Sequence, residues 1–193
     1  RAEIRDAIAY LRLIAQPADD LAFERIINTP KRGLGTASLQ AIHMQARSSD
    51  KPLLAAAIDL VQTEELRPAA RHALSSFVQD IKRWRDSVAT THQADVAKMV
   101  LDESGYTQMW QLDKSPDAEG RLENLTELVN AMQDFDSLQG FLEHIALVTD
   151  GDNDPEYGEV TLMTLHAAKG LEFDAVFLPG WEEGVFPSQR TMD

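Results

Sequence analysis

Cysteine is absent from this 193-residue sequence, and no apolar run approaches the roughly 18 residues that a membrane-spanning helix requires. Without cysteine the chain has no disulfide, no thiolate metal ligand and no cysteine nucleophile, which suits a reducing compartment. The first residues also lack the basic and then apolar layout of a secretory signal. We therefore expect a cytoplasmic protein with no membrane partner, whose 44% of hydrophobic residues suffice for a sizeable core.

Two kinds of catalytic motif are missing as well. An ATP-binding loop of the form G-x-x-x-x-G-K-[ST] does not occur, and the one Lys-Gly pair, Lys169-Gly170, has the reverse order. The five histidines lack the HExxH spacing of a zinc site, and the aspartates of residues 150–154 lack the glycine and the closing glutamate of a calcium loop. We therefore expect no metal site, no bound cofactor and no ATP hydrolysis by the chain alone.

Acidic residues outnumber basic ones, and the excess lies in the second half of the chain. Residues 1–100 contain 14 Lys and Arg against 12 Asp and Glu, whereas residues 101–193 contain 4 against 20, which together give the net charge of −14. A polyanion such as DNA is repelled by the acidic half. Any nucleic-acid contact should therefore lie in the first hundred residues or at isolated bases elsewhere.

Apolar residues at helical spacing dominate residues 1–149. The clearest case is residues 68–88, which contain one apolar stripe that we expect in the core: Leu74, Phe77, Val78, Ile81, Trp84 and Val88. The same spacing predicts a helix over residues 2–15, and the Asp19-Asp20 pair and Thr29-Pro30 mark the start and stop of a helix over 19–28. Further helices are predicted over residues 38–46, 51–61, 94–104, 121–135 and 137–148, with Thr36 capping the first of these and Ser137 the last. The first pattern begins without a cap, so we expect the chain to be part of a longer one.

Two short apolar runs follow residues 149–159, TDGDNDPEYGE, whose turn formers break the helical pattern. VTLMTL (160–165) and DAVFLPG (174–180) are apolar along nearly their whole length, which is typical of strands buried on both faces of a parallel sheet. Two strands do not make a stable sheet alone, so we expect them to pair with strands outside this chain or between copies of it. The predicted fold class is mostly α, with two short β-strands near the C-terminus.

Titratable side chains lie between these two runs, in TLHAAKGLEF. Parallel sheets bind ligands beyond the carboxyl ends of their strands, so His166, Lys169 and Glu172 are candidates to meet a polyanion and a nucleotide. A plain strand-loop-strand connection with solvated charges is the alternative.

The segment KRGLGT, which begins at Lys31, is a second candidate site. Gly33 and Gly35 allow a tight turn, and a helix begins at Thr36, so free amides and the positive end of the helix dipole would face outward beside Lys31 and Arg32. Such an arrangement suits a phosphate group. An ordinary capped turn is the alternative.

Residues 160–187, VTLMTLHAAKGLEFDAVFLPGWEEGVFP, resemble the region around the fifth signature motif of the UvrD/PcrA/Rep family of superfamily 1 DNA helicases. Further segments resemble the same family in the expected order: RAEIRDAIAYLRL, INTPKRGLG, RLENLTELVNAM and SLQGFLEHIALVTD. In this family a helical subdomain, 2B, is inserted into the RecA-like α/β motor domain 2A. The resemblance therefore implies that residues 1–17 and 156–193 belong to 2A and residues 18–155 to 2B.

The resemblance also implies roles for individual residues. Thr164 and His166 would contact the backbone of single-stranded DNA. Glu172 would accept hydrogen bonds from the ribose of the nucleotide and Gly170 would allow close approach, while Lys169 lies either near the phosphates or in a salt bridge of the loop. The glycine turn would grip duplex DNA through its residues Lys31, Arg32, Gly33, Gly35 and Thr36.

The function implied is that of a fragment of an ATP-dependent 3′–5′ DNA helicase acting in DNA repair or replication. The intact parent would bind ATP and Mg²⁺, with DNA and repair or transcription proteins as partners. The alternative is a regulatory docking module whose acidic residues 101–154 bind a basic partner through Glu119, Glu123 and Glu127.

Overall fold

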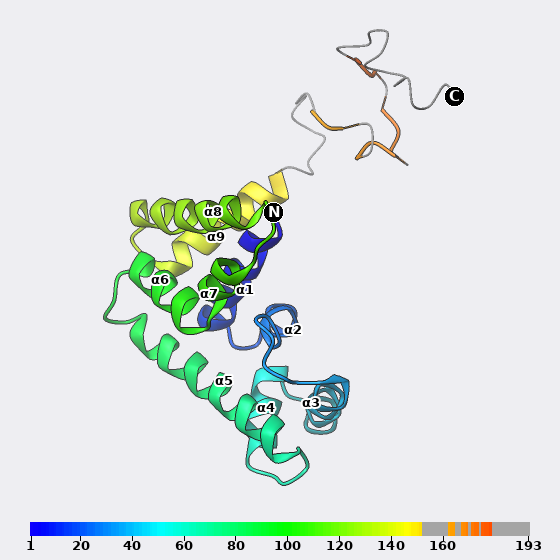
Figure 1. Cartoon of the computed structure of the whole chain (residues 1–193), viewed down its shortest axis with the longest axis vertical. Helices are drawn as coiled ribbons and strands as arrows, with labels where there is room; N and C mark the ends of the chain where they lie inside the picture. Colours follow the sequence, from blue (N-terminus) through cyan, green and yellow to red (C-terminus); the bar gives the residue numbers. More distant parts are fainter. Residues whose placement is uncertain (152–161, 165–166, 170, 174, 179–193) are drawn as a thin grey trace. The chain divides into compact units, whose positions relative to one another are not determined.

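The computed structural model describes residues 1–151, 162–164, 167–169, 171–173 and 175–178. The chain divides into two compact units, Arg1–Asp152 and Asn153–Asp193. Within the described part of the first unit, all regular secondary structure is helical (Figure 1).

The helices follow one another with short connections, in agreement with the prediction that this part of the chain is mostly helical. In order they are α1 (Ala2–Ala15), α2 (Asp20–Ile26), α3 (Thr36–Ser49), α4 (Leu53–Val61), α5 (Pro68–Ser87), α6 (Gln93–Glu103), α7 (Tyr106–Leu112), α8 (Ala118–Ala131), a 3-10 turn (Met132–Asp134) and α9 (Leu138–Gly151). All but α7 were predicted, α1 and α5 from apolar spacing and α2 from the residues that flank it. Ser137 caps α9 as expected, because its hydroxyl accepts a hydrogen bond of 3.0 Å from the amide of Gly140.

Helix α1 lies at the centre of the first unit, where it packs against α2, α5, α6, α8 and α9. Helices α8 and α9 lie at one end of this unit and α3 and α4 at the other, with the long α5 running toward the second end (Figure 1). The division of the chain into residues 1–17, 18–155 and 156–193 is not tested by this packing and stays a prediction.

The apolar stripe of α5 is largely buried as its spacing predicted, but Val88, directly after the helix, was predicted in the core and is 36% exposed. Leu74, Phe77, Ile81 and Trp84 are each at most 2% exposed. The ring of Tyr10 on α1 meets the ring of Trp84 edge-on, with 6.2 Å between the ring centroids. Each such side chain stabilises the fold by about 1.5–3 kcal/mol on burial, so this stripe is a major part of the core.

A polar link joins α5 to α6 at the edge of the core. Nε1 of Trp84 donates a hydrogen bond of 2.7 Å to the carboxylate of Glu103, and a guanidinium nitrogen of Arg83 donates one of 2.5 Å to the same oxygen. These two bonds, that from Trp84 first, hold the pKa of Glu103 below its usual value of 4.5. Glu103 is thus stabilised in its ionised form.

Two carboxylates of α1 join this helix to its neighbours. Glu3, only 3% exposed, accepts a hydrogen bond of 2.7 Å from the side-chain amide of Asn124 on α8. Asp6 accepts one of 2.8 Å from the hydroxyl of Tyr106 and one of 2.7 Å from Nε of Arg25. Since buried carboxylates require such partners, these bonds specify how α1 sits against α2, α7 and α8.

The two predicted β-strands are wrong for the residues that the structure describes. Residues 162–164 and 175–178 form no strand, and Leu162 and Phe177 are 93% and 89% exposed. The burial that the apolar runs predicted is absent as well, since the described residues of both runs are exposed. A strand needs a neighbour with which to exchange backbone hydrogen bonds, and an apolar run does not supply one. The rest of the two runs, residues 160–161, 165, 174 and 179–180, lies outside the described residues. Across the described helices, none is long and apolar enough to cross a bilayer.

Candidate functional site

The glycine turn, residues 31–36, connects α2 to α3 and presents its backbone to solvent. Leu34 is 1% exposed and anchors the turn in the core, whereas Gly33 and Gly35 on either side of it are exposed. Gly33 has φ of 76°, which favours glycine, and a Cβ added at either glycine would meet no atom within 4 Å. The backbone of the turn is therefore open to the approach of another molecule.

Asn28 braces this turn from the end of α2. Its Nδ2 donates a hydrogen bond of 3.0 Å to the carbonyl of Leu34, and its Oδ1 accepts one of 2.8 Å from the amide of Arg32. A cis peptide bond between Thr29 and Pro30 lies between the brace and the turn. One side chain thus satisfies two backbone groups that the turn would otherwise leave unpaired.

The side chain of Arg32 points toward the protein interior. One of its terminal nitrogens donates hydrogen bonds to the carbonyls of Ile26 at 2.8 Å, of Ile27 at 3.2 Å and of Pro30 at 3.2 Å. Carbonyls at the end of a helix have no intrahelical partner, so the guanidinium takes the place of the next turn of α2.

The same guanidinium reaches two aromatic rings. It lies over the ring of Phe77, 4.9 Å from the centroid, and it donates a hydrogen bond to the hydroxyl of Tyr10. The Tyr10 hydroxyl in turn donates one of 2.6 Å to the carbonyl of Thr29. Burial raises the pKa of Tyr10, although the charge of Arg32 and its hydrogen bond act in the opposite direction.

Helix α3 begins at this turn without a side-chain cap. Thr36 was predicted as the capping residue, but it is the first helical residue and Gly35 takes the cap position. The carbonyl of Gly35 accepts hydrogen bonds of 3.0 Å from Ser38 and 3.2 Å from Leu39. The first amides of α3 therefore have no side-chain acceptor among the described residues, as expected for an anion site.

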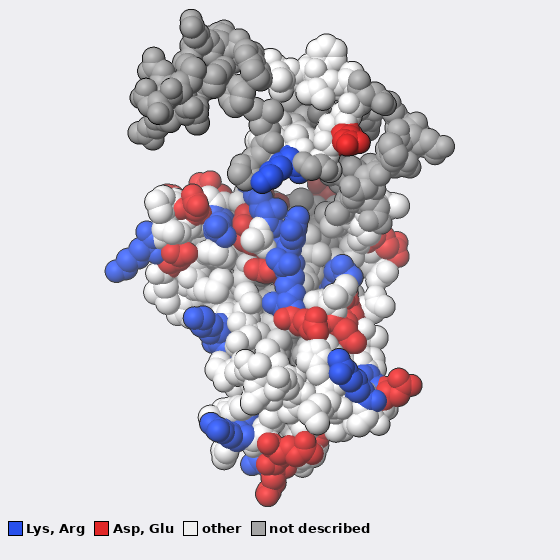
Figure 2. Space-filling model, turned by 90° about the vertical axis from the view of Figure 1, so that its right-hand side faces the viewer, with Lys and Arg blue, Asp and Glu red and all other residues white. Residues whose placement is uncertain are grey.

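Of the two cations in this segment, Lys31 is the one that faces solvent. Lys31 is exposed and has no ion-pair partner within the described part of the chain, whereas Arg32 is half-buried and bonded inward. Elsewhere on the first unit, Lys and Arg side chains gather in a column on one face, with acidic side chains beside it (Figure 2). The positive charge near the glycine turn is therefore carried outward mainly by Lys31 and by the helix dipole of α3.

The segment around Thr164 forms a single turn in its described residues. The carbonyl of Thr164 accepts a hydrogen bond of 3.0 Å from the amide of Ala168, and its hydroxyl accepts one of 3.2 Å from the amide of Ala167. Lys169 and Glu172 are exposed. His166 and Gly170 lie outside the described residues.

These residues do not make a complete site for ATP. Glu172 can accept hydrogen bonds and Lys169 can supply one positive charge, but the sequence has no phosphate-binding loop. In the parts of the chain that the structure describes, no group of three or more His, Cys, Asp or Glu could hold a metal ion. The role of Lys169 and Glu172 in nucleotide binding stays a prediction.

The acidic residues named for the alternative function share one face of α8. Glu119, Glu123 and Glu127 are all exposed and are spaced by four residues. They form an accessible acidic row.

Two residues of the candidate site were missed in the sequence, Tyr10 and Asn28. Tyr10 lies 22 residues before Arg32, within an ordinary helical pattern, and no local signal connects the two. Asn28 precedes a Thr-Pro pair and was taken only as the end of a helix. Its position before a glycine turn could have indicated this role, because asparagine side chains often form hydrogen bonds with the backbone of turns.

The first unit is thus a helical domain with an exposed glycine turn at a helix N-terminus, an arrangement that can accept an anion. The sequence matches the UvrD-like helicase C-terminal domain over residues 1–193, and the chain belongs to this family. It is 45% identical over 195 residues to the probable DNA helicase II homolog of Rickettsia felis and 40% identical over 203 residues to DNA helicase II of Escherichia coli. It is 39% identical over 205 residues to the ATP-dependent DNA helicase PcrA of Bacillus subtilis.

Each of these alignments covers the whole chain but only part of the relative, namely 30%, 28% and 28% of its length, respectively. The chain thus spans less than a third of the relatives that it matches. The family resemblance stated from the sequence motifs is confirmed.

Proposed function

We propose that this chain is the 2B subdomain, with adjoining parts of motor domain 2A, of an ATP-dependent 3′–5′ DNA helicase. In the intact protein the glycine turn holds duplex DNA by its backbone while the motor moves along one strand. Its setting is DNA repair or replication in the cytoplasm, with repair or transcription proteins as further partners. The relatives named DNA helicase II and ATP-dependent DNA helicase PcrA support this proposal.

The observation that carries the proposal is the open backbone of the glycine turn. Exposed Gly33 and Gly35, uncapped amides at the start of α3 and exposed Lys31 together present donors and positive charge without a base-reading side chain. Such a surface suits phosphate groups of any sequence. Arg32 and Asn28 hold the turn from the inside and would not touch the DNA.

A salt series with a short DNA duplex tests this proposal. Each phosphate neutralised by a side chain contributes a slope of about −0.9 in log K against log salt, so Lys31→Ala should lower the affinity and reduce the slope by about that amount. Lys98→Ala, an exposed cation on α6, is the matched control and should change neither quantity. If Lys31→Ala behaves like Lys98→Ala, the duplex assignment fails.

The 2A part would contact single-stranded DNA through Thr164 and His166. It would contact the nucleotide through Lys169, Gly170 and Glu172. The rest of the parent protein would supply the remaining residues of the site for ATP and Mg²⁺. The exposure of Thr164, Lys169 and Glu172 supports their availability for such contacts. The 193-residue chain alone should bind no measurable ATP. Calorimetric titration of the chain with ATP checks this, and micromolar binding would contradict it.

A docking function is the second candidate, and the exposed row Glu119, Glu123 and Glu127 favours it. A basic partner would be attracted to this face of α8 in a salt-dependent manner. Neutralising the three glutamates to Gln should then abolish capture of that partner, while Lys31→Ala should leave it intact. The opposite pattern would assign the partner to the glycine turn.

A further inference from the structure

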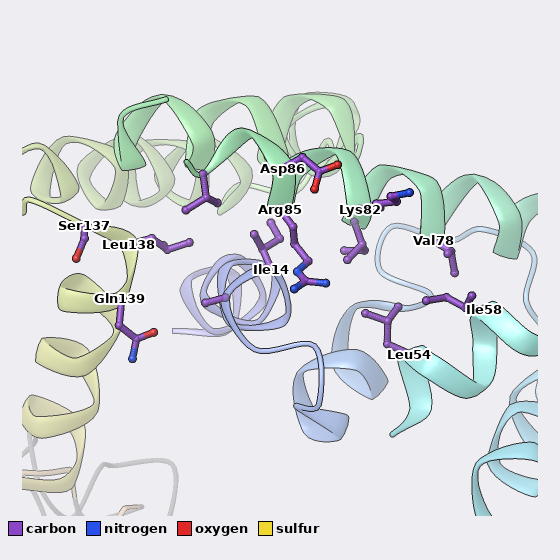
Figure 3. Close-up of a pocket in the computed structure, with 13 residues that line it drawn as sticks. Ile14, Leu54, Ile58, Val78, Lys82, Arg85, Asp86, Ser137, Leu138 and Gln139 are labelled. Carbon is purple, nitrogen blue, oxygen red and sulfur yellow. The ribbon is translucent and has the colours of Figure 1, made fainter. Parts of the chain in front are cut away.

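A groove of about 750 Å³ on the first unit is lined by α1, α4, α5 and α9 (Figure 3). Its floor consists of buried aliphatic side chains: Ile14, Leu54, Ile81 and Leu138. Ile58 and Val88 also line it and are 45% and 36% exposed. This α5 groove therefore offers aliphatic surface, both at its floor and at its edge, that is accessible from solvent.

Two cations of α5 stand over this floor. Lys82 and Arg85 are exposed, lie one helical turn apart, and have no ion-pair partner in the part of the chain that the structure describes. Figure 3 shows Arg85 extending from α5 toward Ile14 of α1, across the middle of the groove. Asp86 is the one acidic residue in the lining.

A second groove, of about 780 Å³, continues the first around the end of α1. Both are lined by Ala15 and Gln139, and the second runs between α1, α2 and α9. It adds three arginines, of which Arg12 and Arg25 are paired within the chain, to Asp19 and Asp6 respectively. The third, Arg5, is exposed. Glu143 lines this groove as well and balances Arg5. The excess of positive charge therefore lies in the α5 groove, at Lys82 and Arg85, on a chain whose net charge is −14.

The side chains of the two grooves decide between two classes of anionic partner. Neither groove has an aromatic residue in its lining, whereas proteins that bind single-stranded nucleic acid use aromatic rings on which bases stack. An aliphatic floor with charges at its rim is instead the surface that receives the apolar face of an amphipathic helix. The charges at the rim then determine whether an acidic or a basic helix binds.

We propose that the α5 groove is a docking site for an acidic amphipathic helix of a partner protein. Leucine-like side chains of that helix lie on the aliphatic floor, and its carboxylates pair with Lys82 and Arg85. This site is separate from the glycine turn and from the acidic face of α8, and it does not depend on the function proposed above.

The test uses the 193-residue chain and a fluorescein-labelled helical peptide with leucine at helical spacing and glutamate on its other face. Fluorescence anisotropy should show binding that weakens at least tenfold for the double variant Lys82→Glu, Arg85→Glu and at least threefold for Ile58→Ser. A version of the peptide with lysine in place of glutamate should show the reverse preference and bind the double variant better. Lys98→Glu is the matched control and should leave the affinity for both peptides unchanged. All four positions are exposed, and circular dichroism with urea unfolding checks that each variant is folded.

Four results would overturn the proposal. The first is equal binding of the glutamate and lysine peptides, and the second is displacement of the glutamate peptide by oligo-dT, which would assign the groove to nucleic acid. The third is self-association of the chain that the double variant abolishes, which would assign the groove to a second copy. For the fourth, Ile58→Cys introduces a single thiol into a sequence without cysteine. Protection of that thiol from a maleimide in the longer helicase, but not in this chain, would assign the groove to the helicase itself.

Discussion

The guanidinium of Arg32 donates a hydrogen bond to the hydroxyl of Tyr10, and this bond joins the glycine turn to the central helix α1. The two residues are 22 positions apart in the sequence. Because the same guanidinium also holds the carbonyls of Ile26, Ile27 and Pro30, it fills the space between α2, α1 and the turn. Arg32 therefore positions the backbone of the turn from the inside.

Arg32→Ala should lower the free energy of unfolding by about 3 kcal/mol, because it removes the donor to the carbonyls of Ile27 and Pro30 and the bond to the hydroxyl of Tyr10. Arg32→Lys keeps the charge but not the planar guanidinium, and we expect it to lower the free energy of unfolding by nearly as much. Lys31→Ala next to it should change stability by less than about 0.5 kcal/mol, as for most exposed positions. Urea unfolding measures all three, and equal stability of the Arg32 and Lys31 alanine variants would contradict the inward role.

Asn28→Ala removes both bonds of the brace and should lower stability by about 1–3 kcal/mol. Asn28→Asp is the matched variant, because its carboxylate still accepts from the amide of Arg32 but has no donor for the carbonyl of Leu34. We expect its stability to lie between those of the wild type and Asn28→Ala. The same urea series shows the order, and an aspartate variant less stable than the alanine one would argue against the brace.

Gly33→Ala should destabilise the protein by about 1–2 kcal/mol, since an L residue is strained at a φ of 76°. Gly35→Ala should change stability by no more than about 0.5 kcal/mol, because the preference of a helix cap for glycine is offset by the lower entropy of alanine in the unfolded chain. Thermal unfolding compares the two. If both glycines respond alike, the backbone conformation does not explain their presence.

Glu103→Gln should reduce stability in a manner that depends on pH. The folded-state pKa of Glu103 lies below its usual value of 4.5, so its carboxylate contributes stability above that pH and loses this contribution as the pH falls through the folded-state value. The difference between the wild type and Glu103→Gln should thus be largest near neutral pH and shrink in acid. Urea unfolding over an acid-to-neutral series measures it, and a constant difference would refute the ionised pairing with Trp84 and Arg83.

The helices were predictable where an apolar stripe continues for several turns, as in α5. Helix α7, residues Tyr106–Leu112, was missed because seven residues are too few to establish a period. The equally short α2 was predicted from the residues on either side of it, Asp19 and Pro30. Helix α7 is held by tertiary packing, because the ring of Tyr106 lies 6.2 Å from that of Tyr10 on α1 and its hydroxyl donates a hydrogen bond of 2.8 Å to Asp6. The strands were wrong because an apolar run predicts burial but cannot supply a pairing partner.

The candidate site was predictable in its backbone and less so in its side chains. Two glycines before a helix are a local signal, and Gly33 indeed has the positive φ that makes glycine useful there. The neighbouring Lys31 and Arg32 look alike in the sequence, yet one is exposed and the other bonded inward. The difference depends on Tyr10 and Phe77, which only the folded chain brings to Arg32.

The central place of α1 limits where this protein can be cut. Its residues Glu3 and Asp6 are bonded to α8, α7 and α2, and its apolar face touches most of the other helices. A shortened version that starts at residue 18, the expected beginning of the inserted subdomain, would lack α1, the central helix against which α2, α5, α6, α8 and α9 pack. Gene designs intended to isolate that subdomain should therefore keep the first fifteen residues attached.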